Sequence, residues 1–261
     1  MKKLVMMSLA ALTLMTLSSC MNVGFSGNNG KDTTPSQVTQ INQVTTMQPF
    51  NEVEVTGSFK IIYEQGTDYN VRVEAEEQAL KEMTIYVKEN ELRICKSVSK
   101  PTVKLKNVKV YVSSPDLQKI ELSGSGTFTA ANLIKSNKDL DVEIAGSGKV
   151  LLTAVTCHDS DLAIAGSGDI EIGNLEVQEV NCEIAGSGNI NLGTMTCKNM
   201  EVEIAGSGDV NCDNINAENV KCEIAGSGNV NLKGTVLNQT KEIMGSGKVN
   251  IVAPTPKDTI K

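Results

Sequence analysis

The residues of this chain that could take part in chemistry are one histidine, seven cysteines and a set of regularly spaced carboxylates. His158 stands between Cys157 and Asp159, an order that suggests a thiol nucleophile beside its base. Neighbouring residues on a strand point to opposite faces, so an inward Cys157 and an outward His158 could not hydrogen-bond directly. We therefore predict no catalytic residue here and interpret His158 as a solvated side chain.

Acidic side chains recur with a period of about twenty residues, which would stack them about 4.8 Å apart if each period were one coil. Such neighbours repel one another, and we expect a solvated acidic face that resists sideways aggregation. The alternative is that these carboxylates bind a cation, and Ca²⁺ would then be favoured because it prefers oxygen ligands. The column reads Glu121, Glu143, Ala163, Glu183, Glu203, Glu223 and Glu242, with Asp141, Asp161 and Glu201 beside it.

A second polar column indicates a ladder of side-chain amides, and such a ladder stabilises stacked strands by itself. We interpret this column as structural, and the alternative is that it contacts a glycan. Its members are Glu171, Asn191, Asn211, Asn231 and Asn250. From these columns we predict no metal site and no cofactor.

The period is set by the tripeptide Gly-Ser-Gly, which occurs seven times at spacings of 22, 20, 20, 20, 20 and 19 residues. Strict apolar alternation flanks every copy, so these are not flexible linkers. We predict that the glycines are structural corners, where positive φ and close approach to neighbouring coils exclude a side chain. They are Gly124, Gly126, Gly146, Gly148, Gly166, Gly168, Gly186, Gly188, Gly206, Gly208, Gly226, Gly228, Gly245 and Gly247.

Apolar positions alternate with polar ones on both sides of each corner, and a third apolar pair follows, as at Val155 and Cys157. Three short strands in twenty residues, repeated in register, predict an all-β chain folded as a parallel β-helix, a solenoid of about 20-residue coils. A left-handed hexapeptide helix would need a multiple of six residues, and the calcium-binding nonapeptide coil a period of nine.

Six cysteines follow Cys20, an even number that in an oxidising compartment suggests disulfides. Cys157 and Cys197 share one apolar column two coils apart, as do Cys182 and Cys222. Two coils are about 9.6 Å, beyond disulfide reach. We expect buried thiols, with a disulfide as the first alternative and a metal or redox site as the second.

The first residues form a secretory signal, with Lys2 and Lys3, an apolar run from 4 to 17, and small residues before Cys20. The end resembles a bacterial lipobox, so we predict that Cys20 carries lipid and anchors the chain to a membrane. The predicted division is a lipoprotein signal peptide over 1–19, a lipid-anchored flexible tether over 20–49, an N-terminal β-rich cap with first coils over 50–119, Gly-Ser-Gly coils over 120–252, and a tail over 253–261.

The cap shows three local patterns. Val53 to Ile61 reads as an early, degenerate copy of the repeat, with Phe59 in place of the second glycine. A strand is predicted over 70–74, a helical turn over 77–82, and a hairpin across 88–90. At the other end Lys241 interrupts an apolar column, and Pro254 and Pro256 stop further pairing.

The lipobox, the polar tether, the segment Pro115-Asp116-Leu117 and the coils from Ile120 onward resemble the head GIN domain of the auto-transporter adhesins of Bacteroidetes. The resemblance covers about residues 50 to 252. It implies a right-handed parallel β-helix on a cell-envelope lipoprotein, and it carries no catalytic residues.

We therefore predict a non-enzymatic envelope lipoprotein, an adhesin or structural binding head, in the cell envelope and at the outer membrane. Its partners would be the membrane, through Cys20, and a protein or glycan ligand. A net charge of −7 without a basic cluster argues against nucleic acid. The alternative is a carbohydrate-active β-helix enzyme of the polysaccharide-lyase type. Against it stand the near-constant coil length and an aromatic content of 3% without tryptophan.

Overall fold

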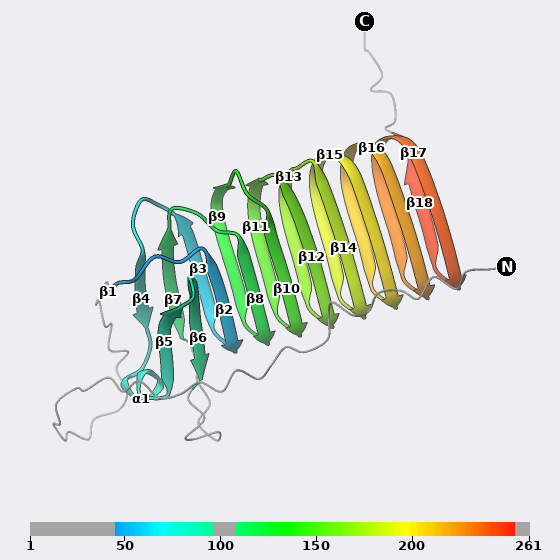
Figure 1. Ribbon diagram of the computed structural model, residues 1–261. Helices are drawn as coiled ribbons and strands as arrows, with labels where there is room; N and C mark the ends of the chain where they lie inside the picture. The colour runs from blue at the N-terminus through cyan, green and yellow to red at the C-terminus, as the bar shows by residue number, and fades with distance from the viewer. Residues whose placement is uncertain (1–44, 97–107, 254–261) are drawn as a thin grey trace, which may run out of the picture.

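The computed structural model describes residues 45–96 and 108–253, which form one continuous stack of strands (Figure 1). The signal peptide, Cys20, most of the tether, Pro254 and Pro256 lie outside the described residues. The N-terminal elements are β1 (Thr45–Thr46), β2 (Glu52–Gly57), β3 (Lys60–Gln65), β4 (Asn70–Glu74), α1 (Glu77–Leu80), β5 (Met83–Lys88), β6 (Glu91–Lys96) and β7 (Lys109–Ser114).

The glycine coils follow as strands that run parallel in the stack. They are β8 (Lys119–Gly124), β9 (Thr127–Lys135), β10 (Leu140–Gly146), β11 (Lys149–Thr156), β12 (Asp159–Gly166), β13 (Asp169–Glu176), β14 (Glu179–Gly186), β15 (Asn189–Gly206), β16 (Asp209–Gly226), β17 (Asn229–Gly245) and β18 (Lys248–Val252).

The register places each residue on its counterpart one repeat later. Gly146 pairs with Gly166, and Gly166 with Gly186, and the same rule holds through Gly226 and Gly245. The predicted parallel β-helix is therefore confirmed, and every column read from the sequence is a physical column.

Each coil has three sides, as the burial pattern of β13 shows. Ile170 and Ile172 are buried at alternate positions, Gly173 and Asn174 are both exposed, and alternation resumes at Leu175. The prediction of three separate short strands per coil was wrong, however. The strands run through this bend, and β15 and β16 continue for 18 residues each through two bends. A strand ends at every Gly-Ser-Gly corner, and β11 and β13 also end at the next bend, after Thr156 and Glu176.

The two glycines of each corner exclude side chains for different reasons. The first glycine has positive φ, from 124° at Gly146 to 142° at Gly226, and a Cβ there would also meet the preceding coil. At Gly146 that Cβ would lie 2.6 Å from the carbonyl oxygen of Gly124. The second glycine has no positive φ, but a Cβ at Gly168 would lie 2.7 Å from the carbonyl oxygen of Gly148. These backbone collisions are with the preceding coil only.

The first coil is formed by β2 and β3, and it is not the outermost layer. Gly57 pairs with Gly124, and Phe59 follows where other coils have glycine, which confirms the degenerate copy. The chain then runs outward, because β6 lies parallel to β2 and β7 parallel to β3. The cap layer therefore comes later in sequence than the coil that it covers.

The cap contains the predicted local elements. The hairpin of β5 and β6 turns through Glu89 and Asn90, which have φ of 55° and 66°, as a two-residue turn requires. The predicted strand is β4, which pairs antiparallel with β7, and the predicted helical turn is α1. No helix of the described residues is long and apolar enough to cross a bilayer.

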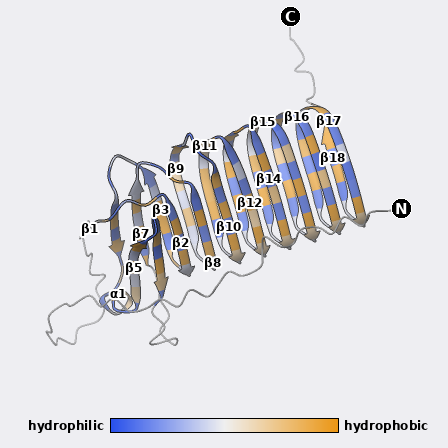
Figure 2. Ribbon diagram, viewed as in Figure 1, coloured by the Kyte–Doolittle hydropathy of each residue, from blue (hydrophilic) through white to orange (hydrophobic). Residues whose placement is uncertain are grey.

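Apolar columns fill the interior from the cap to the last coils, visible as alternating bands in Figure 2. The pattern ends at the C-terminal layer. Lys241 pairs with Cys222 at the end of an apolar column and is exposed, as are Ile243 and Met244. The last layer thus has no further coil over it among the described residues.

Candidate functional site

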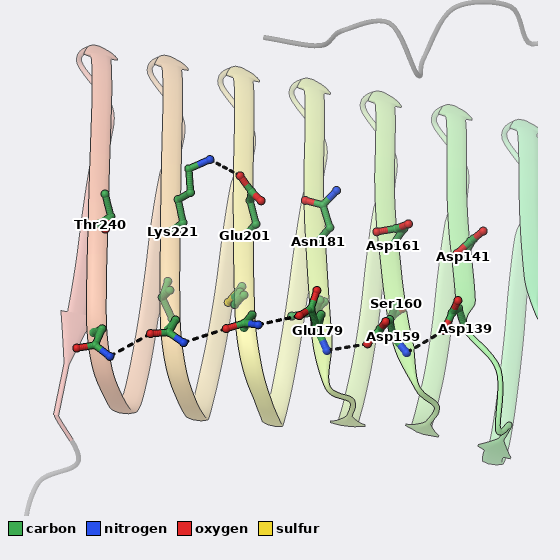
Figure 3. Close-up of a pocket in the computed structure, with 16 residues that line it drawn as sticks. Asp139, Asp141, Asp159, Ser160, Asp161, Glu179, Asn181, Glu201, Lys221 and Thr240 are labelled. Carbon is green, nitrogen blue, oxygen red and sulfur yellow. Dashed lines mark hydrogen bonds and ion pairs between the residues drawn. The ribbon is translucent and has the colours of Figure 1, made fainter. Parts of the chain in front are cut away.

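A polar groove of about 600 Å³ runs along one corner of the β-helix, where each coil enters β12, β14 and the later halves of β15, β16 and β17. Figure 3 shows its side chains as two rows parallel to the long axis. We call it the corner groove. It is lined by Asp139, Asp141, Asp159, Ser160, Asp161, Glu179, Val180, Asn181, Asn199, Met200, Glu201, Asn219, Val220, Lys221, Asn238 and Thr240.

The lower row is a continuous hydrogen-bonded ladder. The Nδ2 of Asn199 donates to Glu179 at 2.8 Å, Asn219 donates to Asn199 at 2.9 Å, and Asn238 donates to Asn219 at 3.0 Å. The ladder forms because identical positions of consecutive coils lie one strand spacing apart. Sequence reasoning did not single out this row, although its spacing of 20, 20 and 19 residues was the available signal.

Carboxylates extend the lower row toward the N-terminal end. Asp139 accepts the backbone N–H of Asp159 at 3.2 Å, and Asp159 accepts that of Glu179 at 3.0 Å. Each carboxylate is thus oriented by the backbone of the next coil.

The upper row changes from acidic to cationic along the stack. Burial, followed by repulsion from Asp161, raises the pKa of Asp141. Burial, followed by repulsion from Glu183, raises the pKa of Asp161. Farther along, Lys221 forms ion pairs with Glu201 and Glu223, the latter at 2.8 Å.

The predicted glutamate column borders the groove, with its members in register and outward. Burial raises the pKa of Glu203, and repulsion from Glu183 and Glu223 adds to it. Lys119 neutralises the N-terminal part by ion pairs with Glu121 at 3.4 Å and Glu143 at 3.1 Å.

The predicted amide ladder lies on another side of the β-helix. Asn211 donates to Asn191 at 3.0 Å, and Asn231 donates to Asn211 at 2.9 Å. Asn250 continues the row to Asn231 at 2.9 Å. The predicted amide ladder is therefore confirmed. It has the same hydrogen-bonding pattern as the asparagine ladder of the corner groove but lies on another side.

Five of the six cysteines expected to be buried thiols are buried free thiols, and these are Cys157, Cys182, Cys197, Cys212 and Cys222. For the sixth, Cys95, the expectation was wrong, because this residue is buried but is not a free thiol. Burial raises the pKa of Cys157 to about 12 and that of Cys212 to about 11. These thiols therefore stay protonated at neutral pH and do not act as nucleophiles.

His158 and Cys157 do not face each other. The Cys157 thiol donates to the carbonyl oxygen of Asp159 at 3.3 Å, whereas His158 Nδ1 lies 2.9 Å from Asp159 Oδ2 on the exposed side. The side chain of His158 is 62% exposed, as predicted for an outward residue. The geometry provides no thiol–imidazole pair.

The comparison with protein families identifies this fold. Residues 49–214 and 193–255 match the family described as "Putative auto-transporter adhesin, head GIN domain". The chain belongs to this family, and it is therefore a head domain of the adhesin type.

Solved structures show the same fold. One is described as a putative adhesin from Bacteroides fragilis, with 24% identity, a TM-score of 0.74, and coverage of 80% of this chain and 95% of that chain. Another, described as a putative lipid binding protein from Parabacteroides distasonis, has 25% identity and a TM-score of 0.69 at the same coverage. Among curated proteins, no match is found.

Proposed function

We propose that this chain is a non-enzymatic adhesin head, anchored in the cell envelope by lipid on Cys20, and that it contacts its ligand along the corner groove. The observation that supports the groove is the ladder from Glu179 through Asn199 and Asn219 to Asn238. It presents the same polar groups at each coil, on a rigid stack, beside a hollow of about 600 Å³.

The ladder leaves hydrogen-bonding capacity free for a ligand. An asparagine amide has two N–H donors and an oxygen with two lone pairs, and the ladder uses one donor and one lone pair of Asn199 and Asn219. The remaining groups repeat about every 4.8 Å. An extended polymer with hydroxyl groups on every unit, a glycan chain, fits this repetition.

Charge narrows the ligand class further. Asp139, Asp141, Asp159 and Asp161 line the groove, and the whole chain has a net charge of −7. Polyanions such as nucleic acid and sulfated glycans are repelled by such a surface. We therefore expect neutral or cationic glycans to bind and polyanions not to bind.

The polysaccharide-lyase alternative has less support. Coil lengths stay at 19 to 20 residues through Gly146 to Gly245, so the repeat gives no long insertion to wall a catalytic cleft. The thiols are buried, and the pKa of Cys157 is raised to about 12. The exposed amides and carboxylates of the corner groove are suited to binding a ligand by hydrogen bonds, which favours a binding head over a lyase.

The segment between Cys20 and Thr45 sets how far the head could lie from the membrane. From Cys20 to Thr45 there are 25 residues, which could extend to at most about 90 Å. Lipid on Cys20 would then hold the rigid stack at the membrane while leaving the groove free to meet a ligand in any orientation.

An array screen tests the proposed ligand class. The mature chain with Cys20→Ser, labelled at a surface lysine, is applied to a glycan and matrix-protein array. We expect neutral or amino-sugar glycans to bind in preference to sulfated glycans and DNA. Preferential binding to polyanions, or binding to no glycan on the array, would contradict the proposal.

A further inference from the structure

Three side chains of metal-ligand type meet at the N-terminal end of the corner groove. They are Asp139, which lies in the bend just before β10, His158, which lies in the equivalent bend one coil later, and Asp159, the first residue of β12. Their ligand atoms all lie within 4.8 Å of one another, and no other group of this kind occurs among the described residues. His158 Nδ1 is 2.9 Å from Asp159 Oδ2 and 3.5 Å from Asp139 Oδ1.

The surroundings lack a compensating cation. Asp141 and Asp161, in the upper row of the groove, lie near Asp139 and Asp159 of the lower row, as Figure 3 shows. Lys119 and Lys221 neutralise the acidic face on either side of this point. Within 45–96 and 108–253, no lysine or arginine forms an ion pair with any carboxylate of the lower row from 139 to 159. A cation is therefore favoured at this position.

We propose that Asp139, His158 and Asp159 form a binding site for a divalent transition-metal ion of the zinc type. Tetrahedral zinc has ligands at about 2.0–2.2 Å, so its ligand atoms lie about 3.4 Å from one another. The two distances from His158 Nδ1, 2.9 and 3.5 Å, are close to that value. Water or a ligand in the groove completes the coordination.

Backbone contacts hold the two carboxylates in place. Asp159 Oδ1 accepts the N–H of Glu179 at 3.0 Å, which leaves Oδ2 turned toward His158. Asp139 Oδ1 accepts the N–H of Asp159 at 3.2 Å. Contacts of this kind orient metal ligands in proteins and strengthen binding.

The donor set selects zinc over calcium. Ca²⁺ takes six to eight oxygen ligands, whereas one imidazole nitrogen with two carboxylates suits zinc. Cys157 adds no ligand, because its thiol faces the interior and donates to the Asp159 carbonyl at 3.3 Å. This site is independent of the proposed glycan ligand, since it needs only these three side chains.

Calorimetric titration of the mature chain, carrying Cys20→Ser, with zinc chloride tests the site. We expect one zinc ion per chain with a dissociation constant below about 1 mM. His158→Ala and the near-isosteric Asp159→Asn should each weaken binding about tenfold or more. Gln178→Ala, at the equivalent bend one coil later, and Cys157→Ala should leave the affinity unchanged.

Three results would overturn the site: no saturable zinc binding, equal affinity in the His158→Ala chain, or displacement of zinc by an equal concentration of Ca²⁺, which would indicate only a diffuse acidic surface. Thermal melting of each variant without metal shows whether it is folded, and Asp159→Asn retains an oxygen for the Glu179 N–H.

Discussion

The carbonyl oxygen of Gly186 accepts the amide N–H of Ser207 at 2.8 Å, across two consecutive corners of the β-helix. A Cβ on Gly206 would point into this same oxygen, and the φ of Gly206 is 140°. The corner hydrogen bond therefore requires that residue 206 has no side chain. This relationship repeats along the stack and keeps the polar columns in register.

Replacing Gly206 by alanine should destabilise the chain by about 2 kcal/mol or more, because the new methyl group meets both positive φ and a backbone oxygen. Urea unfolding of the Gly206→Ala chain measures the loss. Ser207→Ala is the matched control, since this serine is exposed in the same turn. Coincident urea midpoints would show that the glycine is not a steric corner.

Membrane attachment should depend on Cys20. With Cys20→Ser, we expect the protein to leave the membrane fraction and labelled palmitate incorporation to stop, because no other lipid-bearing residue is predicted. Fractionation and labelling of cells expressing the two chains measure this. Palmitate that still enters the Cys20→Ser chain would place the anchor elsewhere.

The buried thiols should make stability fall at alkaline pH. Burial raises the pKa of Cys222 from its ordinary 9.0 to about 11. The unfolded thiol thus ionises from about pH 9 while the folded one stays neutral. The stability that this group contributes is complete below pH 9 and falls by about 1.4 kcal/mol per pH unit up to about pH 11.

Cys222→Val isolates this effect, because valine occupies the same column at Val202. Urea midpoints measured from pH 7 to 11 should decline less steeply in the variant than in the parent chain. Parallel declines would mean that Cys222 does not carry the pH dependence.

The coils could be predicted from the sequence because every repeat shows the same alternation of apolar and polar residues around its glycines. The twenty-residue period alone aligns Gly166 with Gly186 and Asn191 with Asn211, because one coil per period allows only one register. The bend at Gly173 falls between two of the three predicted strands of its coil, but β13 runs through it. Alternation alone cannot distinguish a bend that keeps its hydrogen bonds from one that breaks them.

The cap and the groove were harder to predict. Nothing local to Glu52 or Glu91 indicates that β6 lies outside β2, because that order depends on a long excursion of the chain. The corner groove was missed because its ladder mixes residue types, Asp159, Glu179 and Asn199, at one position. The trio around His158 likewise combines two coils, and only the register brings Asp139 beside Asp159.

The central claim is that the corner groove contacts the ligand, and paired amide variants test it most directly. Asn199→Ala with Asn219→Ala removes the groove ladder, whereas Asn191→Ala with Asn211→Ala removes an equivalent ladder on another side. Affinity is measured by surface plasmon resonance against the glycan that binds best on the array. We expect about a tenfold loss or more for the groove pair, because each lost hydrogen bond costs about 1 kcal/mol, and less than about a twofold change for the control pair. Equal losses in the two pairs, or none in the groove pair, would contradict the claim.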